Sequence, residues 1–204
     1  MYRSKIELHN IDCLPFMKQC DDKQFDLAIV DPPYGIGIDK AMNANKGKQG
    51  FKQYKATDWD SNTPTQEYFN ELFRISKNQI IWGANYMIDK IKKPSQGWVI
   101  WNKVQRDFTM SDAEIAWSSF DRTIRCFDLS RGGAMGCNNK TGGKLHPTQK
   151  PVKLYKWILS NYAKEGDKIL DTHLGSGSIA VACDDLGFDL TAFEIDKDYF
   201  NKAN

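Results

Sequence analysis

The segment from residue 25 to residue 35 constrains the fold more than any other part of the chain. Its apolar residues 27–30 predict a buried strand, which ends at the carboxylate of Asp31. Pro32 and Pro33 then exclude continuation of a strand or a helix, because proline has a fixed φ and no backbone N–H to donate. The chain must therefore fold with a strand that stops abruptly beside an acid and the ring of Tyr34.

This rigid turn also suggests a site. The two prolines direct the Asp31 carboxylate, the Pro32 carbonyl and the Tyr34 ring toward one spot, and the Pro32 carbonyl is free to accept a hydrogen bond from a ligand. Two acceptors beside an aromatic face suit a flat heterocycle that carries an exocyclic amine. The alternative is a proline-rich turn in which Asp31 caps the next element. The candidate catalytic residues are Asp31, Pro32, Pro33 and Tyr34.

A second motif lies near the end of the chain. Residues 168–171 predict a strand that ends in an acid, and residues 172–178 form a Gly-x-Gly turn before a predicted helix. Seventeen residues beyond Gly177, another predicted strand ends in Glu194, which is placed to accept hydrogen bonds from ribose hydroxyls. A Gly-x-Gly turn alone could equally serve a dinucleotide, and Ala180 holds the position of the third glycine of that fingerprint.

The order of predicted elements indicates the fold class. Strands and helices follow one another as β-α-β-α-β, and then a strand pair at 114–120 and 123–127 is joined by Asp121-Arg122. We therefore expect an α/β fold of the Rossmann-like type. Its sheet should be mostly parallel and seven-stranded, with an antiparallel edge hairpin and helices on both faces.

Bulk properties limit the class of protein. With 204 residues, 41% of them hydrophobic, the chain has the length and composition of one globular domain, residues 1–204. The sequence contains neither an apolar run long enough to span a membrane nor an N-terminal signal peptide. The five cysteines are scattered and odd in number, and the three histidines are far apart, so we expect reduced thiols, no metal site and a cytoplasmic location.

Positive charge is concentrated in two loop-like segments. Residues 38–58 hold five basic and two acidic residues, and residues 121–150 hold six and two, although the net charge of the whole chain is only +2. Such segments are suited to phosphate contacts, although solvated surface loops would show the same composition. We interpret 38–58 and 121–148 as candidate DNA-contacting segments. Their candidate contact residues are Lys46, Lys48, Lys52, Arg131, Lys140 and Lys144.

Taken together, the motifs resemble those of the amino methyltransferases, which methylate the exocyclic nitrogen of adenine or cytosine in DNA. Residues 31–34 are similar to their D-P-P-Y motif, and residues 146–151 match their H-P-T-Q-K-P segment. Residues 171–178 resemble their D-P-F-x-G-S-G-T motif, with Thr172 and His173 in place of Pro and Phe. The order, with D-P-P-Y first and the glycine motif last, resembles the circularly permuted β class.

The resemblance implies a cofactor, partners and a site. The cofactor would be S-adenosyl-L-methionine, with Glu194 as the ribose acid and Asp12 at the adenine end. The partner would be double-stranded DNA, and a homodimer and a cognate restriction nuclease are further candidates. The implied cofactor-binding residues are Asp12, Cys13, Asp31, His146, Thr148, Lys150, Asp171, His173, Gly175, Ser176, Gly177, Ser178 and Glu194. For the His173 ring, packing is favoured over stacking on the cofactor.

The resemblance also favours a target. The acid-first form of the motif is mostly found with adenine N6 as the target, so a flipped-out adenine is expected, and cytosine N4 is the alternative. A catalytically idle DNA-binding member of the same fold is a second alternative, against which the intact Asp31, Gly175 and Gly177 argue. In protein-glutamine methyltransferases the glycine motif precedes the N/D-P-P-Y motif, which is the reverse of the order here.

Overall fold

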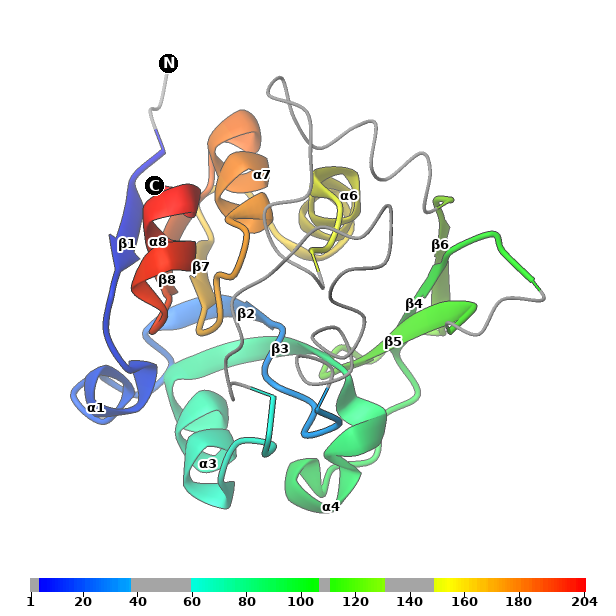
Figure 1. Ribbon diagram of the computed structural model, residues 1–204, viewed down its shortest axis with the longest axis horizontal. Coiled ribbons are helices and arrows are strands. Elements are labelled where there is room, and N and C mark those ends of the chain that lie inside the picture. The colour runs from blue at the N-terminus through cyan, green and yellow to red at the C-terminus, as the bar shows by residue number, and fades with distance from the viewer. Residues whose placement is uncertain (1–3, 38–59, 107–110, 131–148) are drawn as a thin grey trace, which may run out of the picture.

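The computed structural model describes residues 4–37, 60–106, 111–130 and 149–204 (Figure 1). The strands are β1 Ile6–His9, β2 Phe25–Val30, β3 Ser76–Trp82, β4 Trp98–Asn102, β5 Ala113–Ser118, β6 Arg125–Asp128, β7 Lys168–Asp171 and β8 Asp189–Phe193. The helices are α1 Cys13–Met17, α3 Gln66–Ile75, α4 Ile88–Ile91, α6 Val152–Tyr162, α7 Ser178–Leu186 and α8 Lys197–Ala203, with a short 3-10 helix η1 at Ala84–Tyr86.

The strands form one mixed sheet in the order β1-β8-β7-β2-β3-β5-β4-β6. Strands β1, β8, β7, β2 and β3 are mutually parallel, as are β4 and β6, whereas β5 is antiparallel to both of its neighbours. The expectation of a mostly parallel α/β sheet with an antiparallel part is therefore confirmed.

Helices cover both faces of this sheet, as the alternation of side chains along β2 requires. Leu27 and Ile29 point into a core shared with α6 and α7. Ala28 and Val30 point the other way, into a core shared with α1 and α3. Figure 1 shows α6 and α7 on one side of β2 and β3, with α3 and α4 on the other. Strand β2, which ends at the predicted site, is thus buried on both faces.

The expected seven strands and edge hairpin were wrong in detail, because the described residues form a sheet of eight strands in which β5 does not pair with β6. Both strands flank β4 instead, with β5 antiparallel and β6 parallel to it. The connection between them crosses the start of β4 at Gly97, where a side chain would overlap the Phe120 carbonyl oxygen. Because the two predicted strands are close in sequence, a tight turn at Asp121-Arg122 was expected. Instead, Gly97 leaves room for the chain to cross β4 between β5 and β6.

Within the residues described, each helix is too short or too polar to traverse a bilayer.

Candidate active site

The predicted motifs meet at one edge of the sheet. Strands β1, β8, β7, β2 and β3 are parallel, so their carboxyl ends share that edge. The chain continues from β7 to β8 and from β2 to β3, so adjacent β7 and β2 form a topological switch point, the usual ligand site of open α/β sheets. Asp171 ends β7 and Asp31 follows β2 directly. The glycine motif and the D-P-P-Y turn, far apart in sequence, are therefore neighbours.

The Asp31 carboxylate is held by side chains. The Tyr34 hydroxyl donates to Oδ1 at 2.7 Å, and Lys150 Nζ lies 2.5 Å from Oδ2. Lys150 also donates to the Tyr34 hydroxyl at 3.1 Å, which closes a triangle of three functional groups. Each carboxylate oxygen keeps a second lone pair for a ligand donor. Among the residues described, no donor reaches the Pro32 carbonyl oxygen, and its role as an acceptor for a ligand stays a prediction.

A chain of alternating charges extends from this triangle. Lys150 Nζ lies 3.2 Å from Glu114 on β5, and Glu114 pairs in turn with Lys103 Nζ at 2.8 Å. The Lys150 side chain is only 2% exposed. Burial alone would lower its pKa, but Asp31 and Glu114 outweigh burial and raise it above the ordinary value. Lys150 is therefore a buried cation that holds two carboxylates together.

The two acids beside Lys150 titrate differently. Burial raises the pKa of Asp31 above its ordinary range, and Lys150 acts against that rise. Burial would also raise the pKa of Glu114, but Lys150 and Lys103 together lower it below the ordinary value. Glu114 thus serves as the permanent counter-charge, which leaves Asp31 as the carboxylate with the higher proton affinity.

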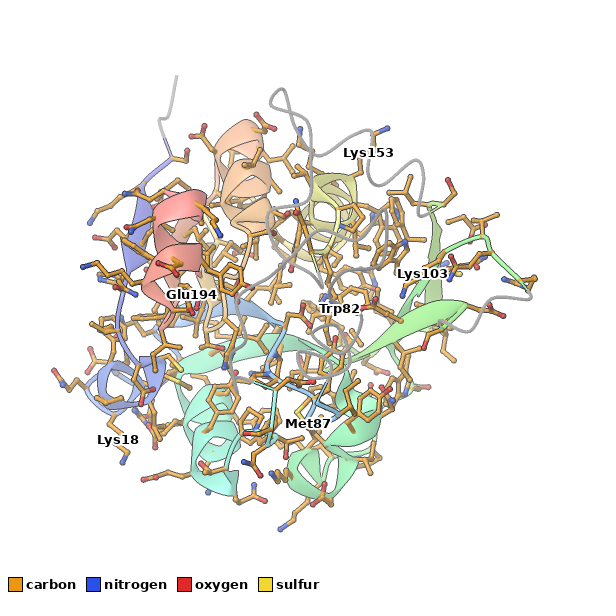
Figure 2. The ribbon with its side chains drawn as sticks, in the orientation of Figure 1. Lys18, Trp82, Met87, Lys103, Lys153 and Glu194 are labelled. Carbon is orange, nitrogen blue, oxygen red and sulfur yellow. The ribbon has the colours of Figure 1, made fainter. Side chains whose placement is uncertain are left out.

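The Tyr34 ring is supported from β3 and η1. It stacks on the Tyr86 ring with centroids 5.3 Å apart and planes inclined by 18°. It also lies directly against Gly83, where any side chain would overlap the ring. Lys150 Nζ lies 5.1 Å from the centre of the Trp82 ring, which ends β3 near the centre of the sheet (Figure 2). Aromatic groups thus enclose the cation and hold the tyrosine.

The backbone of the D-P-P-Y turn is held by Asp60. Its Oδ1 accepts from the N–H groups of Tyr34 at 2.7 Å and Gly35 at 3.0 Å, and its carbonyl oxygen accepts from Gly37 N at 3.0 Å. Asp60 is 1% exposed. The turn therefore has both a side-chain network at Asp31 and a separate backbone clamp.

The glycine turn is arranged differently, because its acids bind backbone amides. Glu194, which follows β8 and lies beside α8 in Figure 2, accepts from Gly175 N and from Asp196 N, each at 2.8 Å. Asp171 Oδ1 accepts from His173 N at 3.0 Å. Gly175 and Gly177 have φ values of 55° and 73°, in the left-handed region that glycine adopts readily. The expected Gly-x-Gly turn between strand and helix is confirmed.

The acids of this half favour their neutral forms. Burial, together with the nearby Asp31 and Glu194 carboxylates, raises the pKa of Asp171 to about 8, against the backbone hydrogen bond from His173. Burial also raises the pKa of Glu194. A cation or a hydrogen-bond donor placed here would therefore be strongly favoured, because it would relieve the crowding of buried acids.

Three further candidates lie at the same end of the sheet. Asp12 caps α1, where its Oδ1 accepts from Leu14 N at 2.9 Å. The adjacent Cys13 is a neutral thiol, because burial raises its pKa to about 12. The His173 ring packs edge-on against Tyr68 with centroids 5.5 Å apart, and burial lowers its pKa to about 4. This contact agrees with the preference for packing.

The structure supports the remaining predictions unevenly. Ser176 and Ser178 hydrogen-bond to each other at 3.0 Å at the start of α7. Lys150 was predicted to bind the cofactor, but its contacts are with the D-P-P-Y turn and Glu114. Eight predicted residues lie outside the described part of the chain: Lys46, Lys48, Lys52, Arg131, Lys140, Lys144, His146 and Thr148.

Sequence reasoning missed Asp60, Tyr86, Lys103 and Glu114. For Glu114 a signal existed, because it is the one charged residue of the predicted strand 114–120, and a charged side chain that becomes buried needs a partner. Tyr86 and Lys103 follow strand ends but belong to no motif. Asp60 had no signal, since its partners lie 25 and 26 residues earlier in the chain.

Comparison with known proteins bears on this site. A family model described as DNA methylase matches residues 134–204. Among similar proteins, Type II methyltransferase M.HpaI of Haemophilus parainfluenzae is 26% identical, over 92% of this chain and 69% of its own length. Type II methyltransferase M2.DpnII of Streptococcus pneumoniae is also 26% identical, over 98% of this chain and 89% of its own length.

Solved structures show the same fold. M1.HpyAVI in complex with SAM has a TM-score of 0.61 and 20% identity, with 97% of each chain covered. The PvuII DNA methyltransferase, described as cytosine-N4-specific, has a TM-score of 0.63 and 12% identity, with coverage of 99% of this chain and 86% of that one.

A glycine turn and an acid-Pro-Pro-Tyr turn at adjacent strand ends of an α/β sheet define the class, a methyltransferase with a nucleoside-containing methyl donor. The family match and the relatives agree with that class. The chain is a DNA methyltransferase, similar to Type II methyltransferases over most of its length and to the DNA methylase family model over residues 134–204.

Proposed function

We propose that the chain transfers a methyl group from S-adenosyl-L-methionine to the exocyclic N6 of an adenine flipped out of double-stranded DNA. One observation carries the proposal: Asp31 and Asp171 stand at the ends of adjacent strands β2 and β7, at the switch point of the sheet. An acceptor for an amine and a site for a nucleoside-containing donor are therefore next to each other.

The residues of the glycine turn fit the cofactor. A sulfonium cation and two ribose hydroxyls call for acidic acceptors, and Asp171 and Glu194 supply them in a site where burial already raises their pKa values. The left-handed Gly175 and Gly177 permit close approach of a ligand to the backbone. Glu194 would hold the ribose and Asp12 the adenine end. When bound, S-adenosyl-L-methionine supplies an electrophilic methyl carbon on sulfur.

The D-P-P-Y turn would activate the amine. The lone pair of an aromatic amine is delocalised into its ring, which makes the nitrogen a poor nucleophile. Asp31 and the Pro32 carbonyl can accept its two N–H groups and favour tetrahedral geometry, which localises the lone pair on nitrogen. Such preorganised acceptors are typically worth about 10²-fold or more in rate.

Lys150 would set the charge of this acceptor. Contact with its ammonium group favours the carboxylate form of Asp31, which burial disfavours. The nitrogen loses one proton when it is methylated. Asp31 is placed to hold that proton before it passes to solvent, because burial raises its proton affinity.

The aromatic groups would hold the flipped base. Tyr34 is half-buried, and the Tyr86 stacked on it is 44% exposed, so an aromatic surface stays accessible beside Asp31. A base that leaves the duplex loses its stacking partners and gains from such a surface.

Segments 38–58 and 121–148 are proposed to contact the DNA backbone. Their net charges of +3 each support this contact, which would make DNA binding strongly salt-dependent. Neutralising Lys46, Lys48 and Lys52 should lower the slope of log K against log salt by up to about three units. An unchanged slope would remove 38–58 from the interface.

A cytoplasmic location suits this substrate. The homodimer and the companion nuclease stay predictions.

One experiment tests the function. The protein is incubated with tritiated S-adenosyl-L-methionine and unmethylated DNA, the DNA is digested, and the labelled nucleoside is identified by chromatography. We expect N6-methyldeoxyadenosine. Label in N4-methyldeoxycytidine would show that cytosine N4 is the target instead. Absence of label would contradict the proposed methyl transfer and favour a catalytically idle DNA-binding protein of the same fold.

A further inference from the structure

We infer that Asp60 is a positioning residue for methyl transfer, because its carboxylate holds the backbone of the D-P-P-Y turn in its working conformation. The inference rests on the proposed function and adds a residue to it. Asp60 belongs to none of the motifs in the sequence and lies 26 residues after Tyr34, whose backbone amide donates to it at 2.7 Å.

The turn needs such an acceptor. Pro32 and Pro33 contribute no N–H groups, and the next two amides, those of Tyr34 and Gly35, lie outside any strand or helix. The buried Asp60 carboxylate accepts from both, at 2.7 and 3.0 Å, and so fixes the backbone of the half-buried Tyr34 and of the exposed Gly35. Hydrogen bonds to an ionised acceptor are about twice as strong as neutral ones.

A second contact makes the clamp two-sided. The Asp60 carbonyl oxygen accepts from Gly37 N at 3.0 Å, so the same residue binds the turn at Tyr34, Gly35 and Gly37. Gly35 has a φ of 71° and lies so close to Thr63 that a side chain there would be 3.0 Å from its backbone nitrogen. The 60–63 segment therefore packs directly on the turn.

The clamp acts on catalytic groups through one residue. Asp60 fixes the Tyr34 backbone, and the Tyr34 hydroxyl donates to Asp31 at 2.7 Å. Movement of the Tyr34 backbone would displace both the ring that faces the base and the hydrogen bond that orients Asp31. Displacement of about 1 Å at a reacting group can cost about 10²-fold in rate. Asp60 itself touches neither of the carboxylates that would hold the cofactor.

The test compares Asp60→Ala, Asp60→Asn and Asp189→Ala. Asparagine keeps an oxygen that can accept both amides, whereas alanine leaves them unpaired. Asp189 is the matched control, because its Oδ1 also accepts a backbone amide, that of Lys5 at 2.7 Å, just before edge strand β1. Tritium transfer at saturating unmethylated DNA gives kcat, calorimetry gives the Kd for S-adenosyl-L-methionine, and hydrogen exchange reports the Tyr34 and Gly35 amides.

For Asp60→Ala we expect kcat to fall at least about tenfold. The cofactor Kd should stay within about twofold, and exchange at Tyr34 and Gly35 should be faster. Asp60→Asn should keep at least about half of the wild-type kcat, and Asp189→Ala should leave kcat unchanged. If alanine prevents folding, Asp60→Ser, whose hydroxyl is too short to reach both amides, takes its place.

Two results would overturn the inference alone: a wild-type kcat in Asp60→Ala, or an Asp60→Asn enzyme as impaired as the alanine variant. A wild-type protein that labels no DNA would instead overturn the proposed function, and the positioning role with it. The wild-type assay therefore separates the two failures.

Discussion

Asp31 after β2 and Asp171 at the end of β7 stand at neighbouring strand ends, yet the chain holds them in opposite ways. Asp31 is bound by side chains, the Tyr34 hydroxyl and the Lys150 ammonium, and Lys150 comes from a segment more than a hundred residues away. Asp171 is bound by the amide of His173, two residues further on. One half of the site depends on long-range ion pairing and the other on local backbone geometry.

The difference follows from what each half must do. A turn that accepts hydrogen bonds from an amine and localises its lone pair on nitrogen needs a charged, oriented acceptor, and Lys150 with its counter-charge Glu114 provides the orientation at the cost of burying three ions. A turn that receives a large cationic ligand needs space and unsatisfied acceptor capacity, which glycines and amide-bound acids provide. The D-P-P-Y half should therefore be the more sensitive to loss of a single side chain.

The largest effect is expected for Lys150→Met. This change leaves the Asp31 and Glu114 carboxylates buried without the cation between them, so the free energy of unfolding should fall by about 3–5 kcal/mol. Denaturant unfolding measures the loss. Lys77→Met is the control, because its pair with Asp26 is exposed and should be worth at most about 1 kcal/mol. Similar losses in the two variants would refute the comparison.

The second prediction concerns Asp171 and pH. In the folded protein the pKa of Asp171 is raised from an ordinary 3.8 to about 8, so the folded state binds the proton more tightly than the unfolded state. The stability gained from that proton is complete below pH 4 and is lost as pH rises through 8. Relative to Asp171→Asn, the wild-type free energy of unfolding should therefore decrease from pH 4 to pH 8, by at most about 1.4 kcal/mol per unit. Chemical unfolding at several pH values measures this. A difference that is constant with pH would show that the acid is already ionised.

A third change tests the cofactor half. Glu194→Ala removes the acceptor for a ribose hydroxyl and for the Gly175 and Asp196 amides, and should weaken cofactor binding by about 1–3 kcal/mol. Calorimetry with S-adenosyl-L-methionine gives the value, and exposed Glu165→Ala serves as the control. Unchanged affinity would remove Glu194 from the site.

The smallest effect is expected at Gly83. Gly83→Ala places a methyl group into the Tyr34 ring, so kcat should fall about tenfold while cofactor affinity is kept. Gly187→Ala is the matched control, because φ is also positive there, +77° against +65°, and no atom lies within 4 Å of the added carbon. Both variants share about 1–2 kcal/mol of backbone strain. Equal kcat values for the two would show that contact with Tyr34 is unimportant.

The same contrast explains what the sequence could predict. The strands that end at Asp31, Asp171 and Glu194 and the glycine turn were predicted correctly, because apolar runs and glycines act locally. The ion-pair partners of Lys150 were not predicted, because a long side chain can reach several acids and only the folded chain determines which of them it contacts. Asp60 and the passage of the chain across β4 at Gly97 depend likewise on contacts between distant segments.

The most direct test of the two-part site is the kinetics of Asp31→Ala, with Asp26→Ala, on the strand β2 that precedes Asp31, as its control. Loss of the amine acceptor should lower kcat at least about 10²-fold, while calorimetry shows a cofactor Kd within about twofold of wild type. Asp26, paired with Lys77 away from the site, should leave both unchanged. Retention of more than about a tenth of the wild-type kcat by Asp31→Ala would contradict the account.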